Sequence, residues 1–180
     1  MPREPRAEAR IYLDCDGVLA DFESGATAAL GLPPRVFEKR FGLKTFWARL
    51  EAAPDFFGGL DLLPDAVALY EAVRDCEPVI LTGLPRGAWA EPQKRRWARR
   101  HFPGVEVITT SAALKREHCH PGDVLVDDND RFRHLWEREG GVFIHHTSAS
   151  TSIAELRRLG FLDPAGADPG RWTPSRPQAI

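Results

Sequence analysis

Two carboxylates two residues apart, Asp14 and Asp16, directly follow a short apolar stretch at residues 10–13. In an extended chain this spacing places both side chains on one side, and Gly17 then allows a sharp backbone turn. Such carboxylates repel each other unless a cation or a proton lies between them, and Mg²⁺ prefers oxygen ligands of this kind. An acidic surface turn is the alternative, and it fits poorly because an apolar strand leads directly into Asp14.

A second acidic pair, Asp127 and Asp128, follows another apolar stretch at residues 124–126. Both are candidate metal ligands, although Asp128 or Asn129 could also serve as a helix N-cap, and the two roles can coexist. Upstream, Lys115 lies where its ammonium group could reach the same place and bind phosphate as a point charge. The alternative for Lys115 is an ordinary surface lysine.

A hydroxyl and a glycine, Thr82 and Gly83, stand at the end of the apolar stretch 78–82. Such a pair can donate hydrogen bonds to an oxyanion through the hydroxyl and the exposed backbone N–H groups. Taken alone, the pair is more often an ordinary strand end. The oxyanion-binding interpretation is favoured because all three polar segments follow apolar strands.

The elements that must position these residues alternate between strand and helix. This alternation predicts an α/β fold, a three-layer Rossmann-like parallel sheet with helices on both faces. Ligands bind at the carboxyl ends of strands in such sheets, so we expect the polar segments to meet there. The predicted strands are 10–13, 78–82, 105–109, 124–126 and 142–145, and the predicted helices include 91–102, a helix ending near 139, and 152–159.

The stretch between the first two strands, residues 22–76, is too long for one crossover helix. Its pattern is helical to about residue 53, with breaks at 31–34 and at Gly42. We therefore expect a small helical cap, residues 22–64, inserted after the first strand. The Rossmann-like catalytic core would comprise residues 10–21 and 65–162, and residues 163–180 would form an irregular tail.

Composition restricts the class of protein. The chain has 180 residues, 43% hydrophobic and 28% charged, with a net charge of −2, which argues against a stable nucleic-acid partner. The basic run at 94–100 is interpreted as a solvated helix face. Three widely spaced cysteines favour neither zinc nor disulfides, and no apolar run approaches the ~20 residues of a membrane span. We expect a cytoplasmic protein without a membrane partner, and its oligomeric state is not predicted.

The order of acidic pair, hydroxyl, lysine and acidic pair resembles the haloacid dehalogenase superfamily, in its phosphatase branch. Residues 14–18, Asp-Cys-Asp-Gly-Val, resemble its first motif, and Thr82, Lys115 and Asp127-Asp128 resemble the other three. A closer resemblance is to the cytosolic 5′(3′)-deoxyribonucleotidases, carried by residues 18–23, Trp47, 56–57, Leu60, Pro64, 94–97 and 101–102. The chain departs from that family in three places: Asp65 stands for a glycine, Gly83-Leu84-Pro85 stands for Ser-Pro, and the segment around Lys115 is longer.

This resemblance implies a Mg²⁺-dependent phosphomonoester hydrolase that acts through an aspartyl-phosphate. Asp14 would be the nucleophile and Asp16 the general acid and base, with Thr82, Gly83 and Lys115 holding the phosphoryl oxygens. The expected metal-binding residues are Asp14, Asp16 through its carbonyl, Asp127 and Asp128. Asp127 would pair with Lys115, although the two last aspartates could exchange roles.

The aromatic residues of the predicted cap bear on the choice of substrate. Phe22, Trp47 and the other aromatics at 46 and 56–57 either form a substrate pocket or build the core of the cap. We expect a (deoxy)nucleoside monophosphate, with a sugar phosphate or another small phosphomonoester as the alternative.

Two other functions share parts of this pattern. A dehalogenase would not need Asp16, because halide leaves without a proton. A phosphate-sensing regulatory module carries its acceptor aspartate on a middle strand, and the stretch 105–109 ends without an acid. Cys15 and the pair His145-His146 are interpreted as structural, since no third metal ligand is evident beside the histidines.

Overall fold

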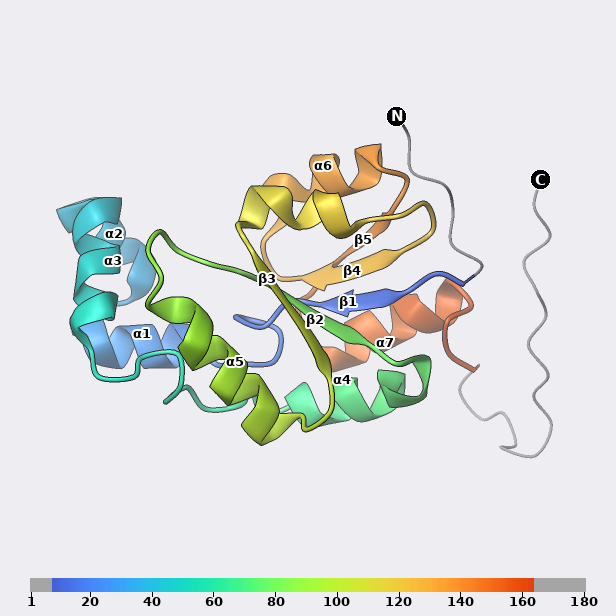
Figure 1. The fold of residues 1–180 in the computed structure, drawn as a ribbon, viewed down its shortest axis with the longest axis horizontal. Helices are drawn as coiled ribbons and strands as arrows, with labels where there is room; N and C mark the ends of the chain where they lie inside the picture. Colours follow the sequence, from blue (N-terminus) through green and yellow to red (C-terminus); the bar gives the residue numbers. More distant parts are fainter. Residues whose placement is uncertain (1–7, 164–180) are drawn as a thin grey trace.

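The computed structural model describes residues 8–163, which form a five-stranded, all-parallel sheet with helices on both faces (Figure 1). The predicted α/β class and parallel sheet are therefore confirmed. The strand order is β3-β2-β1-β4-β5, so β1 lies at the centre between β2 and β4. The strands are β1 (Ile11–Leu13), β2 (Val79–Gly83), β3 (Glu106–Thr110), β4 (Val124–Asp127) and β5 (Val142–His145).

Alternate residues of each strand divide between two apolar clusters, one on each face of the sheet. In β1, Ile11 and Leu13 belong to the larger cluster, and Tyr12 between them belongs to the smaller one. The larger cluster includes residues of α4 (Ala66–Val73), α5 (Ala90–His101) and α7 (Ala149–Arg158). The smaller cluster contains Trp136 of α6 (Arg133–Arg138), so the sheet is covered on both faces.

Three helices follow β1 and lie beyond the end to which the strands run, at the left of Figure 1. They are α1 (Phe22–Leu30), α2 (Pro34–Phe41) and α3 (Leu43–Ala52). The breaks expected from sequence are present: α1 ends at Gly31, with φ 74°, and Gly42 separates α2 from α3 with φ 83°. Glycine adopts such positive φ values without steric penalty.

The two chain segments that lead into and out of this helical region run side by side. The backbone N–H of Asp21 donates to the carbonyl of Asp61 over 2.8 Å, and that of Leu63 donates to Leu19 over 2.9 Å. Asp21 also caps α1, because its carboxylate accepts from the N–H of Ser24. These bonds fix where α1 departs from the end of β1.

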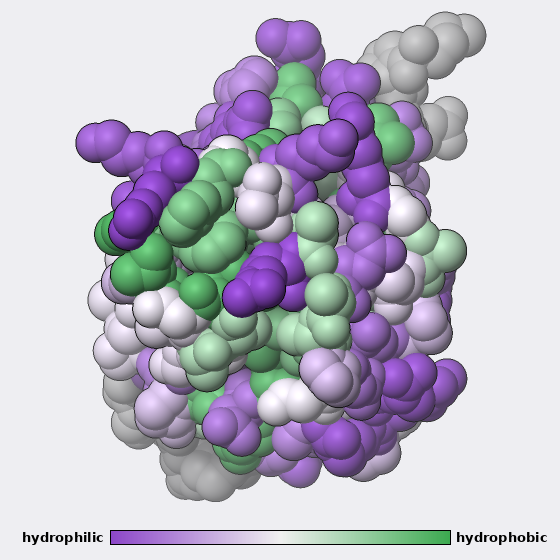
Figure 2. Space-filling model, turned by 90° about the vertical axis from the view of Figure 1, so that its left-hand side faces the viewer, coloured by the Kyte–Doolittle hydropathy of each residue, from purple (hydrophilic) through white to green (hydrophobic). Residues whose placement is uncertain are grey.

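The outer surface of the helical region carries charged and apolar side chains together (Figure 2). Val36, Phe41 and Leu43 are the exposed large apolar residues of α2 and α3. Among the helices of residues 8–163, none has the length and apolar character needed to cross a bilayer.

Helix α7 begins at Ala149, three residues earlier than the sequence pattern suggested. A capping box explains the earlier start, because Ser148 and Thr151 each accept a hydrogen bond from the other's backbone N–H. Apart from Asp163, the predicted irregular tail, 163–180, lies outside the described residues.

Candidate active site

Three neighbouring strands bring the predicted polar residues to one edge of the sheet. Asp14 follows β1, Thr82 lies near the end of β2, and Asp127 ends β4. All three residues are buried, with exposed fractions of 8%, 1% and 5%. Since β2 and β4 flank β1, motifs that are far apart along the chain form one compact polar site.

Three carboxylates from this edge form a group that could hold a cation. Asp14, Asp127 and Asp128 each offer an oxygen, and these oxygens all lie within 4.8 Å of one another. Gly17 makes this approach possible: it has φ +76°, and a Cβ atom there would collide with the Asp128 carboxylate. The glycine of the first motif therefore leaves room for the last acid of the site.

The electrostatics of this group indicate that it requires positive charge. Burial, followed by the charge of Asp14, raises the pKa of Asp127 to about 6 and that of Asp128 to about 7. The residue Asp128 as a whole is exposed, but its carboxylate lies against Gly17. Burial of the carboxylate is therefore the main cause of its raised pKa. Clustered carboxylates with raised pKa values match the oxygen-rich sites that Mg²⁺ prefers.

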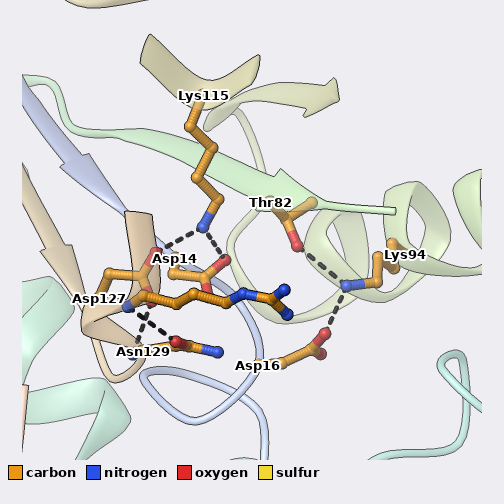
Figure 3. Close-up of polar contacts among 8 residues, drawn as sticks. Asp14, Asp16, Thr82, Lys94, Lys115, Asp127 and Asn129 are labelled. Carbon is orange, nitrogen blue, oxygen red and sulfur yellow. Dashed lines mark hydrogen bonds and ion pairs between the residues drawn. The ribbon is translucent and has the colours of Figure 1, made fainter. Parts of the chain in front are cut away.

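Lys115 supplies one positive charge within the site. It lies on the 3₁₀ helix η2 (Ala112–His118), and its side chain is buried between two carboxylates (Figure 3). Its Nζ donates to Oδ2 of Asp127 over 2.7 Å and forms an ion pair with Oδ1 of Asp14 at 2.8 Å, outside hydrogen-bond geometry. Burial alone would lower the pKa of Lys115, but the charges of Asp14 and Asp127 raise it above its usual value.

Both oxygens of Asp127 have partners in the protein. Besides the contact with Lys115, Oδ1 accepts from the backbone N–H of Asn129 at 2.9 Å. Asn129 in turn caps the 3₁₀ helix η3 (Asp130–Phe132), because its side chain accepts from the N–H of Arg131. The capping role expected for Asp128 or Asn129 thus belongs to Asn129, and the Asp128 carboxylate faces the metal-binding group.

Asp16 lies apart from these three carboxylates and binds a different lysine. Its Oδ2 accepts from Nζ of Lys94 over 2.5 Å, and the same Nζ donates to Oγ1 of Thr82 at 2.9 Å. Burial raises the pKa of Asp16, and the charge of Lys94 opposes that rise. Figure 3 shows Lys94 reaching both residues from α5.

The position of Lys94 corrects the interpretation of the basic run. Lys94 is 2% exposed, so it does not belong to a solvated helix face. Helical spacing contains the explanation, because the buried residues of α5 are Ala90, Lys94, Trp97 and Ala98, at i, i+4, i+7 and i+8. A lysine on the same face as a buried tryptophan could have been identified from sequence.

Other residues of α5 hold the segment 55–60, which connects α3 to the second half of the chain. Trp97 donates through its indole N–H to the carbonyl of Leu60 over 2.7 Å. Gln93 accepts from the backbone N–H of Phe57, and Arg100 donates to the carbonyl of Gly58. The basic helix therefore positions a segment that carries two aromatic side chains.

The aromatic residues expected from sequence form a group beside Lys94. The rings of Phe22 and Trp47 lie 6.4 Å apart, and Phe22 stacks on Phe57 at 6.3 Å. Phe57 also stacks on Trp89 at 5.3 Å, a contact that sequence reasoning missed. Phe57 is buried, whereas Phe22, Trp47 and Trp89 are half-buried.

The structural interpretations of two further features agree with the packing. Cys15 is 3% exposed within the larger apolar cluster. His146 contacts Ser152 at 2.8 Å, and His145 contacts the carbonyl of Asp128. Within residues 8–163, neither histidine belongs to a group able to hold a metal ion.

Comparison with known proteins now identifies the class that this fold and site define, a phosphomonoester hydrolase. The sequence model of the family described as "5′ nucleotidase, deoxy (Pyrimidine), cytosolic type C protein" matches residues 37–150. The chain therefore belongs to this family. The match covers Thr82, Lys115, Asp127 and Asp128, and the pair Asp14 and Asp16 precedes it.

The chain is also similar to a human protein in sequence and to a bacterial structure in fold. The cytosolic-type 5′(3′)-deoxyribonucleotidase of Homo sapiens is 29% identical over 146 residues, which cover 69% of this chain and 72% of that protein. The crystal structure of a hydrolase from Streptococcus pneumoniae TIGR4 is similar in fold, with a TM-score of 0.53 and 14% identity. That comparison covers 86% of this chain and 98% of the other.

Proposed function

We propose that this protein is a Mg²⁺-dependent 5′-nucleotidase that hydrolyses deoxynucleoside monophosphates through an aspartyl-phosphate on Asp14. The observation that carries the proposal is the approach of Asp14, Asp127 and Asp128 within 4.8 Å, with Lys115 paired to the first two. The family match and the human deoxyribonucleotidase support the substrate class.

In this proposal, Asp14, Asp128 and the backbone carbonyl of Asp16 would hold the metal. Asp127 is less available, because both of its oxygens already accept hydrogen bonds, and it orients Lys115. When bound, Mg²⁺ would offset the repulsion between the Asp14 carboxylate and the phosphate dianion and stabilise the charge that spreads over the transferring group.

The first chemical step transfers the phosphoryl group to Asp14. A carboxylate oxygen of Asp14 bonds to phosphorus while the ester P–O bond breaks, and Asp16 gives its proton to the leaving alkoxide. Lys115, Thr82 and the N–H groups at Gly83 would hold the phosphoryl oxygens. Thr82 and Lys115 are almost fully buried, so they act where water screens charge weakly.

The second step releases phosphate. Asp16, now a carboxylate, removes a proton from a water molecule whose oxygen bonds to phosphorus. The bond between phosphorus and Asp14 breaks, and both carboxyl groups return to their starting states. Burial raises the pKa of Asp16, which favours the protonated form that a general acid needs.

The helical region 22–64 serves as a cap in this proposal and forms the substrate pocket above the carboxylates. Phe22 and Trp47 are half-buried and offer flat apolar surfaces to a nucleobase. A cytoplasmic location fits the cytosolic type of the human relative.

A screen of phosphomonoesters tests the proposal. Each 5′- and 3′-deoxynucleotide, several sugar phosphates and p-nitrophenyl phosphate are assayed with Mg²⁺ and with EDTA, and Asp14→Asn serves as the inactive control. We expect Mg²⁺-dependent turnover with the highest kcat/KM for a 5′-deoxynucleotide. Preference for a sugar phosphate would contradict the substrate class, and undiminished activity in EDTA would contradict the metal.

A further inference from the structure

We propose that Lys94 is a positioning residue that assigns the roles of individual atoms in Asp16 and Thr82. By anchoring Oδ2 of Asp16, it leaves Oδ1 to transfer the proton. By donating to Thr82, it leaves the threonine hydroxyl to donate to the phosphoryl group. This inference rests on the proposed function, in which Asp16 is the general acid and base.

The burial of Lys94 shows that its contacts are specific. An ammonium group is rarely buried without a charged partner, and Lys94 is 2% exposed. Its Nζ meets Asp16, Thr82 and the face of the Phe57 ring, whose centroid lies 4.4 Å away. An ammonium group has three N–H donors, so these three contacts account for all of them.

The two oxygens of Asp16 differ in their surroundings. Oδ2 accepts the short bond from Lys94. Oδ1 is buried and accepts no hydrogen bond from residues 8–163, although a quarter of the whole side chain is exposed. Lys94 therefore holds the carboxyl group by one oxygen and leaves the other without a partner among the described residues. A group that carries a proton to a leaving alkoxide needs such a free oxygen in a fixed position.

Thr82 receives a defined role from the same contact. A threonine hydroxyl can donate one hydrogen bond and accept two. Because the ammonium group of Lys94 can only donate, Oγ1 of Thr82 must accept in this pair at 2.9 Å. The hydroxyl hydrogen then remains to be donated elsewhere, which is what a phosphoryl oxygen requires.

The contact with Phe57 extends this arrangement to the segment 55–60. Phe57 is anchored to the same helix, because its backbone N–H donates to Gln93, the neighbour of Lys94. One turn of α5 thus holds the acid and base, the threonine and an aromatic ring together. A displaced Lys94 would disturb all three.

The dependence on leaving group distinguishes positioning from a general structural role. The deoxynucleoside leaves as a basic alkoxide and needs a proton, whereas p-nitrophenolate is a good leaving group that needs little help. We expect Lys94→Met to lower kcat/KM for the 5′-deoxynucleotide by ~100-fold and for p-nitrophenyl phosphate by ~10-fold or less, since general acid catalysis contributes about 10²–10⁴-fold. Both values come from one protein sample, so their ratio does not depend on the folded fraction.

Two further variants support the comparison. Lys94→Gln retains an amide donor, and its ratio should shift in the same direction. This variant provides the test if Lys94→Met folds poorly. Arg99→Met removes an exposed positive charge from the same helix and should leave the ratio at its wild-type value. An unchanged ratio in both Lys94 variants would overturn the inference.

Asp16→Asn separates this inference from the proposed function. If Asp16 is the general acid, Asp16→Asn changes the ratio, and adding Lys94→Met then changes it by less than about threefold, because coupled residues are not additive. A normal ratio in Asp16→Asn would refute the acid role itself. A changed ratio in Asp16→Asn beside a normal one in Lys94→Met would overturn only the role of Lys94.

Discussion

The ammonium group of Lys115 lies 2.7 Å from Oδ2 of Asp127 and joins η2 to the end of β4. Both side chains are more than nine-tenths buried. Replacing this lysine by an apolar residue would leave two buried carboxylates, Asp127 and Asp14, without their shared cation. An uncompensated buried charge is strongly destabilising.

Lys115→Met should therefore lower the free energy of unfolding by ~3 kcal/mol in EDTA, since breaking a buried ion pair costs about 3–5 kcal/mol. Urea denaturation followed by circular dichroism measures this change. Lys44→Met, at an exposed position of α3, is the control and should have little effect. A loss below about 1 kcal/mol would place Lys115 among ordinary surface ion pairs.

Gly17→Ala should weaken metal binding, because the added Cβ collides with the Asp128 carboxylate. Gly31→Ala is a matched control, with φ +74° against +76° and no atom within 4 Å of the added Cβ. Both variants should lose roughly 1–2 kcal/mol of stability from the left-handed backbone. Titration with Mg²⁺ should show a shift of about tenfold or more in half-activating concentration for Gly17→Ala alone. Equal shifts would contradict the role assigned to Gly17.

The pH dependence of metal stabilisation follows from the raised pKa values of Asp127, about 6, and Asp128, about 7. Above their ordinary pKa of 3.8, the folded metal-free protein holds more protons on these groups than the unfolded chain. They therefore stabilise the fold at low pH, and this contribution is lost as the pH rises through about 6 and 7.

Mg²⁺ should compensate that loss. We expect the increase in Tm on adding Mg²⁺ to be larger at about pH 8 than at about pH 5.5, because ligands must be deprotonated to bind a metal. The difference should be about 3 °C or more, as ~1 kcal/mol of stability shifts Tm by several degrees. Asp128→Asn should remove most of this difference. A Tm increase that does not depend on pH would argue against a carboxylate metal site.

Two buried tryptophans provide a test of the contact between α5 and the segment 55–60. Trp97 donates to Leu60 over 2.7 Å, whereas Trp136, on the other face of the sheet, donates to Asp123 over 3.4 Å. Both are 1% exposed. Trp97→Phe should raise KM for the nucleotide several-fold, because it releases the segment that carries Phe57, and Trp136→Phe should affect stability alone. Steady-state kinetics and thermal denaturation of both variants separate the two effects, and equal KM values would contradict the assignment.

Much of the fold was predictable because the strands are short apolar runs that end in polar residues. The parallel sheet, the breaks at Gly31 and Gly42, and the approach of Asp14 to Asp127 all follow from that pattern. The resemblance to the nucleotidase family drawn from the sequence depended on these residues and on their order along the chain.

Lys94 and Trp89 were not predicted, for a physical reason. Helical spacing places Lys94 on the same face as Trp97, but a basic helix is usually solvated, and only the packing of α5 shows that this face is buried. Trp89 contacts Phe57 across 32 positions of sequence, a pairing set by the docking of the segment 55–60. Local sequence pattern contains no information about such long-range contacts.

The most direct test of the account is chemical trapping of the covalent intermediate. The protein is mixed with a 5′-deoxynucleotide and Mg²⁺, quenched in acid within one turnover and reduced with borohydride, which converts an aspartyl-phosphate to homoserine. Mass spectrometry of the peptides then locates the modified residue. We expect homoserine at position 14. Modification at Asp128 or at another aspartate, or an unmodified Asp14 during active turnover, would contradict the mechanism.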